Sequence, residues 1–125
     1  EVSEMPKNAG LDYFHPNESE QFTFYRIPKI LFTDERFCGL SADAKILYGL
    51  MLDRMGLSVK NGWIDQNGHV FIYFTLENAM EYLGCGHGKA VRLFAGLDTK
   101  SGAGLIERRK TEVLISQKRT GVILM

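Results

Sequence analysis

The sequence predicts a mainly helical domain with a small antiparallel sheet, an α+β fold in the order of a winged helix-turn-helix. Three observations predict this fold class. Two short amphipathic segments flank a glycine-rich turn at residues 84–86, a longer amphipathic segment precedes them, and two short β-prone segments follow. Because two short helices joined by a tight turn bury little apolar surface by themselves, we expect the long helix and the sheet to pack beneath them.

The first forty residues predict only short elements. Residues 22–27 are aromatic and β-branched, which favours a strand, and Pro28 ends this strand or confines it to a sheet edge. Residues 30–32 predict a short irregular or helical segment. Residues 1–21 are acidic and show no sustained periodicity, so we expect a flexible arm that a partner could order.

The longest predicted helix starts after Ser41, whose hydroxyl is an N-cap candidate, and Asp43 in its first turn favours the positive end of the helix dipole. It ends near Gly56 or continues to Val59. The face expected to contact the core consists of Ala44, Ile46, Leu47, Tyr48, Leu50, Met51 and Met55. The residues expected to face solvent are Lys45, Asp53 and Arg54.

The second half of the chain predicts the helix pair and the wing. Residues 70–74 predict a mostly buried strand, and Thr75 then caps the first short helix, whose inward positions are Leu76, Ala79, Met80 and Leu83. The second short helix, at about residues 86–97, is expected to direct toward the core Ala90, Val91, Phe94 and Leu97. Residues 105–109 and 113–115 predict the wing strands, and residues 122–125 could pair again.

The composition fits one soluble globular domain, because 45% of the 125 residues are hydrophobic and 24% are charged. We place this domain at residues 22–125, after the arm, and expect it to be a fragment of a longer protein. No apolar stretch reaches the roughly 18 residues of a membrane span. The polar N-terminal residues do not resemble a signal peptide. Cys38 and Cys85 have no paired spacing, which favours a reducing cytoplasm.

The formal net charge of zero hides a strong asymmetry. Residues 1–85 contain 7 Lys and Arg against 12 Asp and Glu, a net charge of −5, whereas residues 86–125 contain 8 against 3, a net charge of +5. The basic part therefore begins where the second short helix begins. A basic patch beside such a helix is typical of a phosphate-binding surface, although an ordinary solvated face has the same composition.

The second helix of a helix-turn-helix commonly enters the major groove, so double-stranded DNA is the expected partner. Lys89 and Arg92 lie three residues apart and share an exposed face, and the arginine is the better candidate for a bidentate contact with guanine. On the wing, strand alternation would place Arg108 and Lys110 on one face and Arg109 on the other. The residues expected to contact DNA are His87, Lys89, Arg92, Lys100, Arg108, Arg109 and Lys110.

Other kinds of site find little support in the sequence. Cys85 and His87 have no second ligand pair at zinc-finger spacing, so we expect no metal. No acid–base pair, nucleophile motif or Gly-rich phosphate loop is recognisable, and we expect neither an enzyme nor a cofactor. Four aromatic residues are most simply core residues, and any exposed ones among them would mark a protein interface. They are Trp63, Phe71, Tyr73 and Phe74.

These residues resemble the N-terminal domain of the RepA-type plasmid replication initiators of low-GC Gram-positive bacteria. The resemblance covers roughly residues 22–109 and is most specific in the long helix and the Asn-Gly-Trp sequence after it. The matching runs are residues 24–29, 31–33, 39–45, 47–55, 61–63, 74–75 and 104–108.

The resemblance implies a winged helix that dimerises and binds repeated origin sequences of a plasmid, with host replication proteins as further partners. Such domains are also similar to primosomal DnaD-type N-terminal domains, so an oligomerisation module of a primosome-type assembly is the alternative. The chain has Gly86-His87-Gly88 where the family commonly has Ser-Asp-Lys, and Gly88 costs the helix about 1 kcal/mol relative to alanine. Ala95-Gly96 replaces a charged pair, and the family's usual Gly-Lys-Pro turn is missing beyond Arg109.

Overall fold

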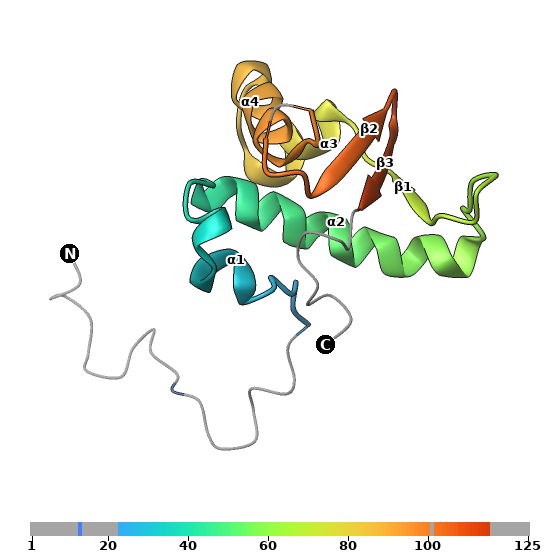
Figure 1. Cartoon of the computed structure of the whole chain (residues 1–125), viewed down its shortest axis with the longest axis horizontal. Helices are drawn as coiled ribbons and strands as arrows, with labels where there is room; N and C mark the ends of the chain where they lie inside the picture. Colours follow the sequence, from blue (N-terminus) through green and yellow to red (C-terminus); the bar gives the residue numbers. More distant parts are fainter. Residues whose placement is uncertain (1–12, 14–22, 101, 116–125) are drawn as a thin grey trace, which may run out of the picture.

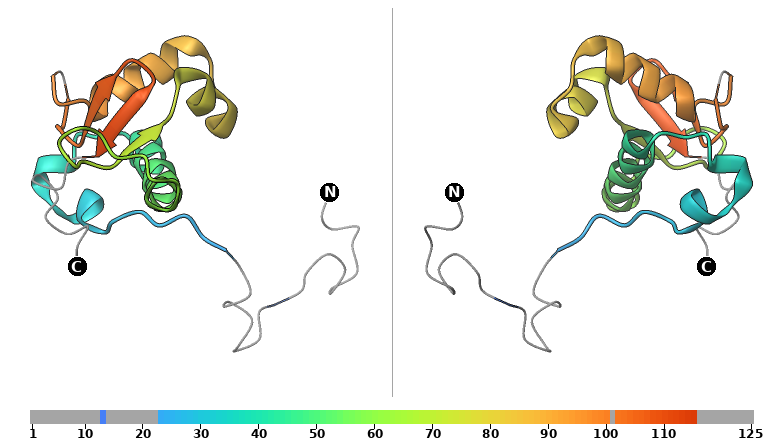
Figure 2. Two further views of the ribbon diagram at one scale, coloured as in Figure 1. Left: turned by 90° about the vertical axis from the view of Figure 1, so that its right-hand side faces the viewer. Right: turned by 90° about the vertical axis from the view of Figure 1, so that its left-hand side faces the viewer.

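The structure is a computed structural model that describes residue 13, residues 23–100 and residues 102–115. Helix α2 (Ala42–Asn61) runs through the centre of the domain (Figure 1). Helices α3 (Leu76–Leu83) and α4 (His87–Leu97) lie with the sheet on one side of α2. The short helices α1 (Ile30–Thr33) and η3 (Glu35–Phe37), with the extended chain before them, lie on the other side (Figure 2). The predicted α+β winged helix is therefore confirmed.

The sheet contains three short antiparallel strands in the order β1-β3-β2, namely β1 (Phe71–Tyr73), β2 (Ile106–Arg109) and β3 (Glu112–Ile115). The predicted strands at residues 70–74, 105–109 and 113–115 are thus confirmed. Fully buried Ile72, Ile106 and Val113 form its inner face and join the core cluster that contains α2. The predicted arm, apart from Tyr13, and the predicted strand at 122–125 lie outside the described residues.

The strand predicted at residues 22–27 is wrong for the part that is described, because residues 23–27 belong to no strand. This segment instead crosses α2 at Gly49. A Cβ atom on Gly49 would lie 2.8 Å from Cγ1 of Ile27 and 3.1 Å from the carbonyl oxygen of Arg26, so a larger residue would push the segment away. Within residues 23–27 only Ile27 is partly covered, and residues 23–26 are exposed, so their aromatic and β-branched character does not reflect strand pairing.

Helix α2 starts as predicted and ends later than predicted. The backbone N–H of Ala44 donates to Oγ of Ser41 at 3.1 Å, which confirms the N-cap. The helix continues past Gly56 and Val59 to Asn61, and Gly62 follows with a φ of 72°. Glycine accepts this left-handed conformation without strain, so the stop signal is Gly62 rather than Gly56.

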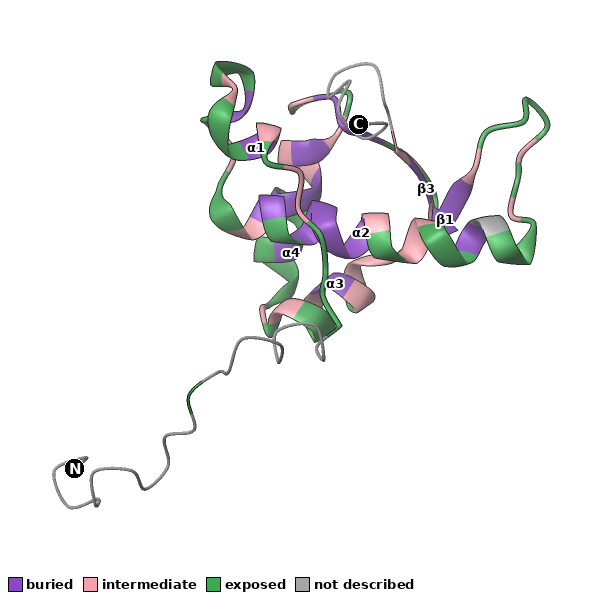
Figure 3. Cartoon of the chain, turned by 90° about the horizontal axis from the view of Figure 1, so that it is seen from below, coloured by how far each residue is buried: buried purple, intermediate pink, exposed green. Residues whose placement is uncertain are grey.

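Most of the α2 core face is confirmed, with two residues exchanged. Of the predicted inward residues, Ile46 is exposed and Met55 is half-buried, and the others are buried. Lys45 is buried rather than solvent-facing, because its Nζ lies 4.4 Å from the centre of the Phe32 ring on α1. Buried residues are concentrated in the first half of α2, where elements cover it from both sides (Figure 3).

The predicted helix pair is confirmed with its capping residues. The hydroxyl of Thr75 accepts from the N–H of Asn78 at 3.1 Å, and the Asn78 side chain accepts from the N–H of Thr75 at 3.0 Å. Such a capping box stabilises a helix by about 1 kcal/mol. Gly84 ends α3 with a φ of 62°, the left-handed conformation expected of the turn.

Candidate nucleic-acid interface

Helix α4 is held by one apolar face, which leaves the other face exposed. Its buried residues are Ala90, Leu93, Phe94 and Leu97. The prediction that Val91 faces the core is wrong, since Val91 is 41% exposed and Leu93 is buried instead. The inward stripe therefore has the i, i+3, i+4, i+7 spacing of a helix packed along one line. As a result, Val91 adds an apolar side chain to the exposed face.

The exposed face of α4 begins in its first turn, as predicted for His87, Lys89 and Arg92, all of which are exposed. Among the described residues, Arg92 has no ion pair. Its Nη1 lies 3.6 Å from the position of a Cβ on Gly88, so the side chain extends along the helix toward its N-terminus. Arg92 is therefore a guanidinium on a rigid, solvent-facing helix surface.

Lys89 differs from Arg92 because it has a carboxylate partner. Its Nζ lies 2.5 Å from Oδ2 of Asp43, in the first turn of α2. This hydrogen bond, supported by the opposite charge, raises the pKa of the Lys89 ammonium above its ordinary value. The pair is accessible to solvent, with 46% of the Lys89 side chain and 41% of the Asp43 side chain exposed.

The wing is a β-hairpin whose strands β2 and β3 are joined by Lys110 and Thr111. Lys110 is exposed and has a φ of 57°, an uncommon conformation for a residue with a side chain. Because Lys110 lies in the turn, the prediction that it shares a strand face with Arg108 is wrong. The structure places this lysine at the tip of the wing.

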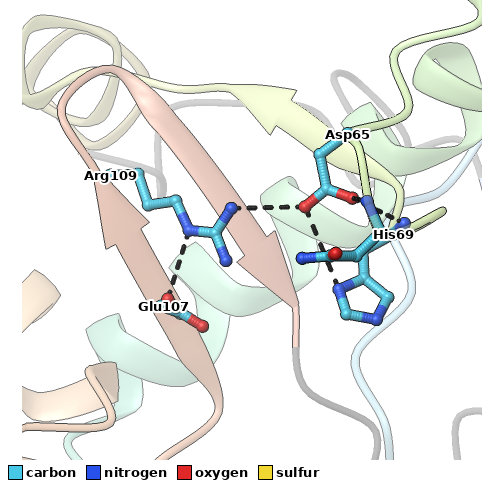
Figure 4. Close-up of polar contacts among 5 residues, drawn as sticks. Asp65, His69, Glu107 and Arg109 are labelled. Carbon is cyan, nitrogen blue, oxygen red and sulfur yellow. Dashed lines mark hydrogen bonds and ion pairs between the residues drawn. The ribbon is translucent and has the colours of Figure 1, made fainter.

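Arg109 lies on the outer face of the wing between two carboxylates (Figure 4). Its Nε donates to Oε2 of Glu107, and its Nη1 donates to Oδ2 of Asp65, both at 3.2 Å. The contact with Glu107, followed by that with Asp65, raises the pKa of Arg109. Asp65 also accepts from the backbone N–H groups of His69 and Asn67, each at 2.9 Å. Arg109 thus ties the wing to the loop between α2 and β1.

Arg108 points to the opposite face of the sheet, as strand alternation predicts. Its guanidinium carbon lies 4.5 Å from the centre of the Phe94 ring, so the side chain contacts α4. Its Nε is buried and has no hydrogen-bond partner within the described part of the chain. Arg108 therefore stabilises the junction of α4 and the wing through a cation–π contact. Lys100, in the loop between α4 and β2, is exposed.

The predicted aromatic core divides into buried and exposed members. Phe71 and Phe74 are buried, but Trp63 is half-buried and Tyr73 is 41% exposed. The rings of Trp63 and Tyr73 meet edge to face at 4.9 Å, and Ile64 beside them is 52% exposed. We call Trp63, Ile64 and Tyr73 the aromatic surface. Exposed apolar residues gathered in this way are typical of protein interfaces.

Across residues 13, 23–100 and 102–115, no group of three or more His, Cys, Asp and Glu side chains is arranged to hold a metal ion. Cys85 is half-buried and His87 is exposed. Within the same residues, no helix is both long enough and apolar enough to cross a membrane.

Sequence reasoning did not identify Asp43 and Asp65 as partners of predicted DNA-contacting residues. Each lies on an element far from its cation in the sequence, and periodicity describes only one element at a time. The contact of Arg108 with Phe94 likewise joins a strand to a helix, so no pattern within one element predicts it.

The chain is similar to replication initiators and DNA-binding proteins. The family described as Replication initiator protein A (RepA) N-terminus matches residues 23–119. A "41 kDa protein" of Lactobacillus helveticus is 36% identical over 70 residues, which are 56% of this chain and 20% of that protein. The chain thus matches only about a fifth of the length of this curated relative.

Three solved structures share the fold. "N-Terminal domain of DNA binding protein" has a TM-score of 0.63 and 32% identity, covering 90% of this chain and 92% of that one. "Structure of MDR initiator" has a TM-score of 0.65 and 32% identity, covering 83% and 84%. "Structure of Rep-DNA complex" has a TM-score of 0.64 and 31% identity, covering 90% and 93%.

Proposed function

The chain belongs to the Replication initiator protein A (RepA) N-terminus family, and we propose that it binds repeated sequences of a plasmid replication origin as double-stranded DNA. In this proposal α4 is the recognition helix in the major groove, and the wing contacts the flanking phosphates. The observation that carries the proposal is the exposed face of α4, where Arg92 has no carboxylate partner among the described residues.

The side chains of α4 suit base recognition. Arginine can donate two hydrogen bonds to O6 and N7 of guanine, and an exposed apolar residue such as Val91 can contact the methyl group of thymine. His87 lies in the first turn of α4, the end of a recognition helix that commonly contacts base edges. The similarity to a structure described as a Rep–DNA complex, at 31% identity over 90% of this chain, supports the same kind of ligand here.

The other cations are suited to phosphate contacts, but they differ in how available they are to DNA. Lys100 and Lys110 are exposed, and Lys110 lies at the wing tip. Arg108 is partly covered, with its guanidinium against Phe94. Lys89 and Arg109 already hold carboxylates, so each must exchange its partner to bind a phosphate. We therefore assign discrimination between sequences mainly to Arg92 and sequence-independent affinity mainly to Lys100 and Lys110.

A salt series tests this assignment. Fluorescence anisotropy would measure the affinity for duplexes that carry candidate origin repeats of a host plasmid and for random duplexes. We expect the repeats to bind more tightly, and both affinities to fall as salt rises, because bound cations release counterions from DNA. Equal affinity for both duplexes, or no binding at moderate salt, would remove the proposed recognition.

The proposal includes a homodimer, with the aromatic surface as its contact. Trp63, Ile64 and Tyr73 expose apolar area on the side of the sheet that carries Arg109, away from the core. Ile64→Asp is expected to shift the mass measured by light scattering toward the monomer. Ile46→Asp, at a similarly exposed apolar residue on α2, is the matched control. An unchanged mass for Ile64→Asp would remove this surface from the dimer.

The same aromatic surface favours a second candidate function, a module for protein assembly. In that case the domain forms a stable higher oligomer whose mass does not change when duplex DNA is added. In either case we place the protein in the cytoplasm. We expect the domain to be part of a longer initiator that contacts host replication proteins. We propose no catalytic step for this domain. Light scattering with and without DNA separates the two candidates, and a strict monomer under both conditions would count against both.

A further inference from the structure

The ion pair between Lys89 and Asp43 joins the first turns of two helices, α4 and α2. Lys89 is the third residue of α4, where the positive end of the helix dipole disfavours a cation. The N-cap residue of α4 is Gly86, which has no side chain to cap the helix, and the first turn of α4 has no acidic residue. Asp43 of α2 thus supplies the negative charge that the start of α4 lacks.

The position of this pair matters because Lys89 lies in the predicted recognition helix beside Arg92. A lysine contacts phosphate as a point charge, so a mobile Lys89 would strengthen binding to any duplex without reading its sequence. With Asp43 in contact, the positive charge of the ammonium is already balanced by a carboxylate before DNA arrives. A phosphate that binds Lys89 must displace Asp43, and it then faces an unpaired carboxylate on α2.

We propose that Asp43 limits sequence-independent DNA binding by holding Lys89 away from phosphates. The inference rests on the proposed function and adds a residue outside the recognition helix and the wing. It divides the cations of α4 into Arg92, which is available to a base, and Lys89, which is withheld.

Asp43→Asn tests the proposal, because asparagine keeps the size of the side chain and removes its charge. The affinity for a random-sequence duplex should rise about two- to five-fold, the value of a solvent-exposed ion pair. The plot of log affinity against log salt should become steeper by about 0.9, the value of one added phosphate contact. The matched control is Asp53→Asn, which removes the same charge from an exposed position on α2. The control should change neither quantity by as much.

The same substitutions made in a Lys89→Gln variant test whether Asp43 acts through Lys89. In Lys89→Gln, the substitution Asp43→Asn should give no larger gain than Asp53→Asn. Lys89→Gln alone should weaken random-duplex binding less than twofold, because Asp43 already balances the charge of Lys89. This measurement does not require the Asp43 variant to fold.

The outcomes separate this inference from the proposed function. If the wild type binds DNA but Asp43→Asn and Asp53→Asn behave alike, the role of Asp43 is overturned and the proposed function stands. A gain that persists in Lys89→Gln also overturns it, as does a large loss of affinity from Lys89→Gln alone. If the wild type binds no duplex, the proposed function and this inference are overturned together.

Discussion

Helix α4 and the β2–β3 wing each carry one exposed cation that is held by a carboxylate and one exposed cation that no described carboxylate holds. On α4, Lys89 is held by Asp43, and Arg92 lies along the exposed surface. On the wing, Arg109 is held from the loop between α2 and β1, and Lys110 lies at the turn. Both regions therefore present fewer available positive charges than the sequence suggests.

The regions differ in how firmly the available cation is positioned. Arg92 belongs to a helix with one fully packed face, so its backbone position is fixed relative to the core. Lys110 lies in a two-residue turn with a left-handed φ, at the tip of a short hairpin. An arginine on a fixed backbone suits the reading of base edges, whereas a lysine on a tip suits phosphates, whose geometry is less demanding.

Phe94→Ala should disrupt both α4 and the wing, because both regions pack against this ring. Phe94 is fully buried, lies 6.3 Å from the ring of Phe74 and carries the guanidinium of Arg108 on its face. Removing so large a buried side chain costs about 3–5 kcal/mol. Urea unfolding measures this loss. Val91→Ala, on the exposed face of the same helix, should change stability by less than about 0.5 kcal/mol.

Arg92→Ala should remove discrimination between DNA sequences, which would separate the role of α4 from that of the wing. We expect the preference for origin repeats over random duplex to fall by about 1–3 kcal/mol, the value of one bidentate base contact. Lys110→Gly should instead weaken both duplexes alike, because a phosphate contact carries no sequence information. Anisotropy titrations at one salt concentration compare the two variants. If Arg92→Ala weakened both duplexes equally, the two regions would not differ in role.

The sequence predicted correctly those features that depend on interactions between residues close together in the chain. The caps at Ser41 and Thr75 and the glycine turn that begins at Gly84 depend on neighbouring residues, and all three were predicted. The exposed residues of α4 were also predicted, apart from Val91. The rotation of a helix by one position depends on which elements cover it, so the burial of Lys45 under Phe32 required the three-dimensional structure.

The same distinction between local and long-range interactions applies to the candidate site. Residue type and position on a helix were enough to select Arg92 as an exposed cation. The withdrawal of Lys89 and Arg109 into ion pairs depends on carboxylates from α2 and from the loop after it, which no local pattern connects to them. Counting charges therefore overestimated the available cations.

Gly88→Ala tests whether the low helix propensity of glycine in the first turn of α4 is needed for DNA binding. A Cβ at this position meets only Nη1 of Arg92, at the ordinary contact distance of 3.6 Å. Alanine should therefore stabilise the domain by about 1 kcal/mol, since glycine loses more backbone entropy in a helix. Thermal unfolding measures the gain, and duplex titration shows whether Arg92 tolerates its new neighbour. If Gly88→Ala destabilised the domain, the expectation that glycine weakens the first turn of α4 would be wrong.

The smallest effect should come from protonating Asp65, which holds the wing through Arg109. The backbone N–H of His69, then that of Asn67 and the side chain of Arg109, hold the pKa of Asp65 below its ordinary value of 3.8. A carboxyl with a lowered pKa in the folded state stabilises the fold fully above its unfolded value, and this contribution is lost as the pH falls through the folded value. Urea unfolding from about pH 6 to about pH 3 should therefore show a steeper acid loss for the wild type than for Asp65→Asn. Asp53→Asn, at an exposed position on α2, should keep the wild-type slope. Parallel profiles for the wild type and Asp65→Asn would mean that the contacts of the Asp65 carboxylate do not stabilise the folded state, and Arg109 would then be held by Glu107 alone.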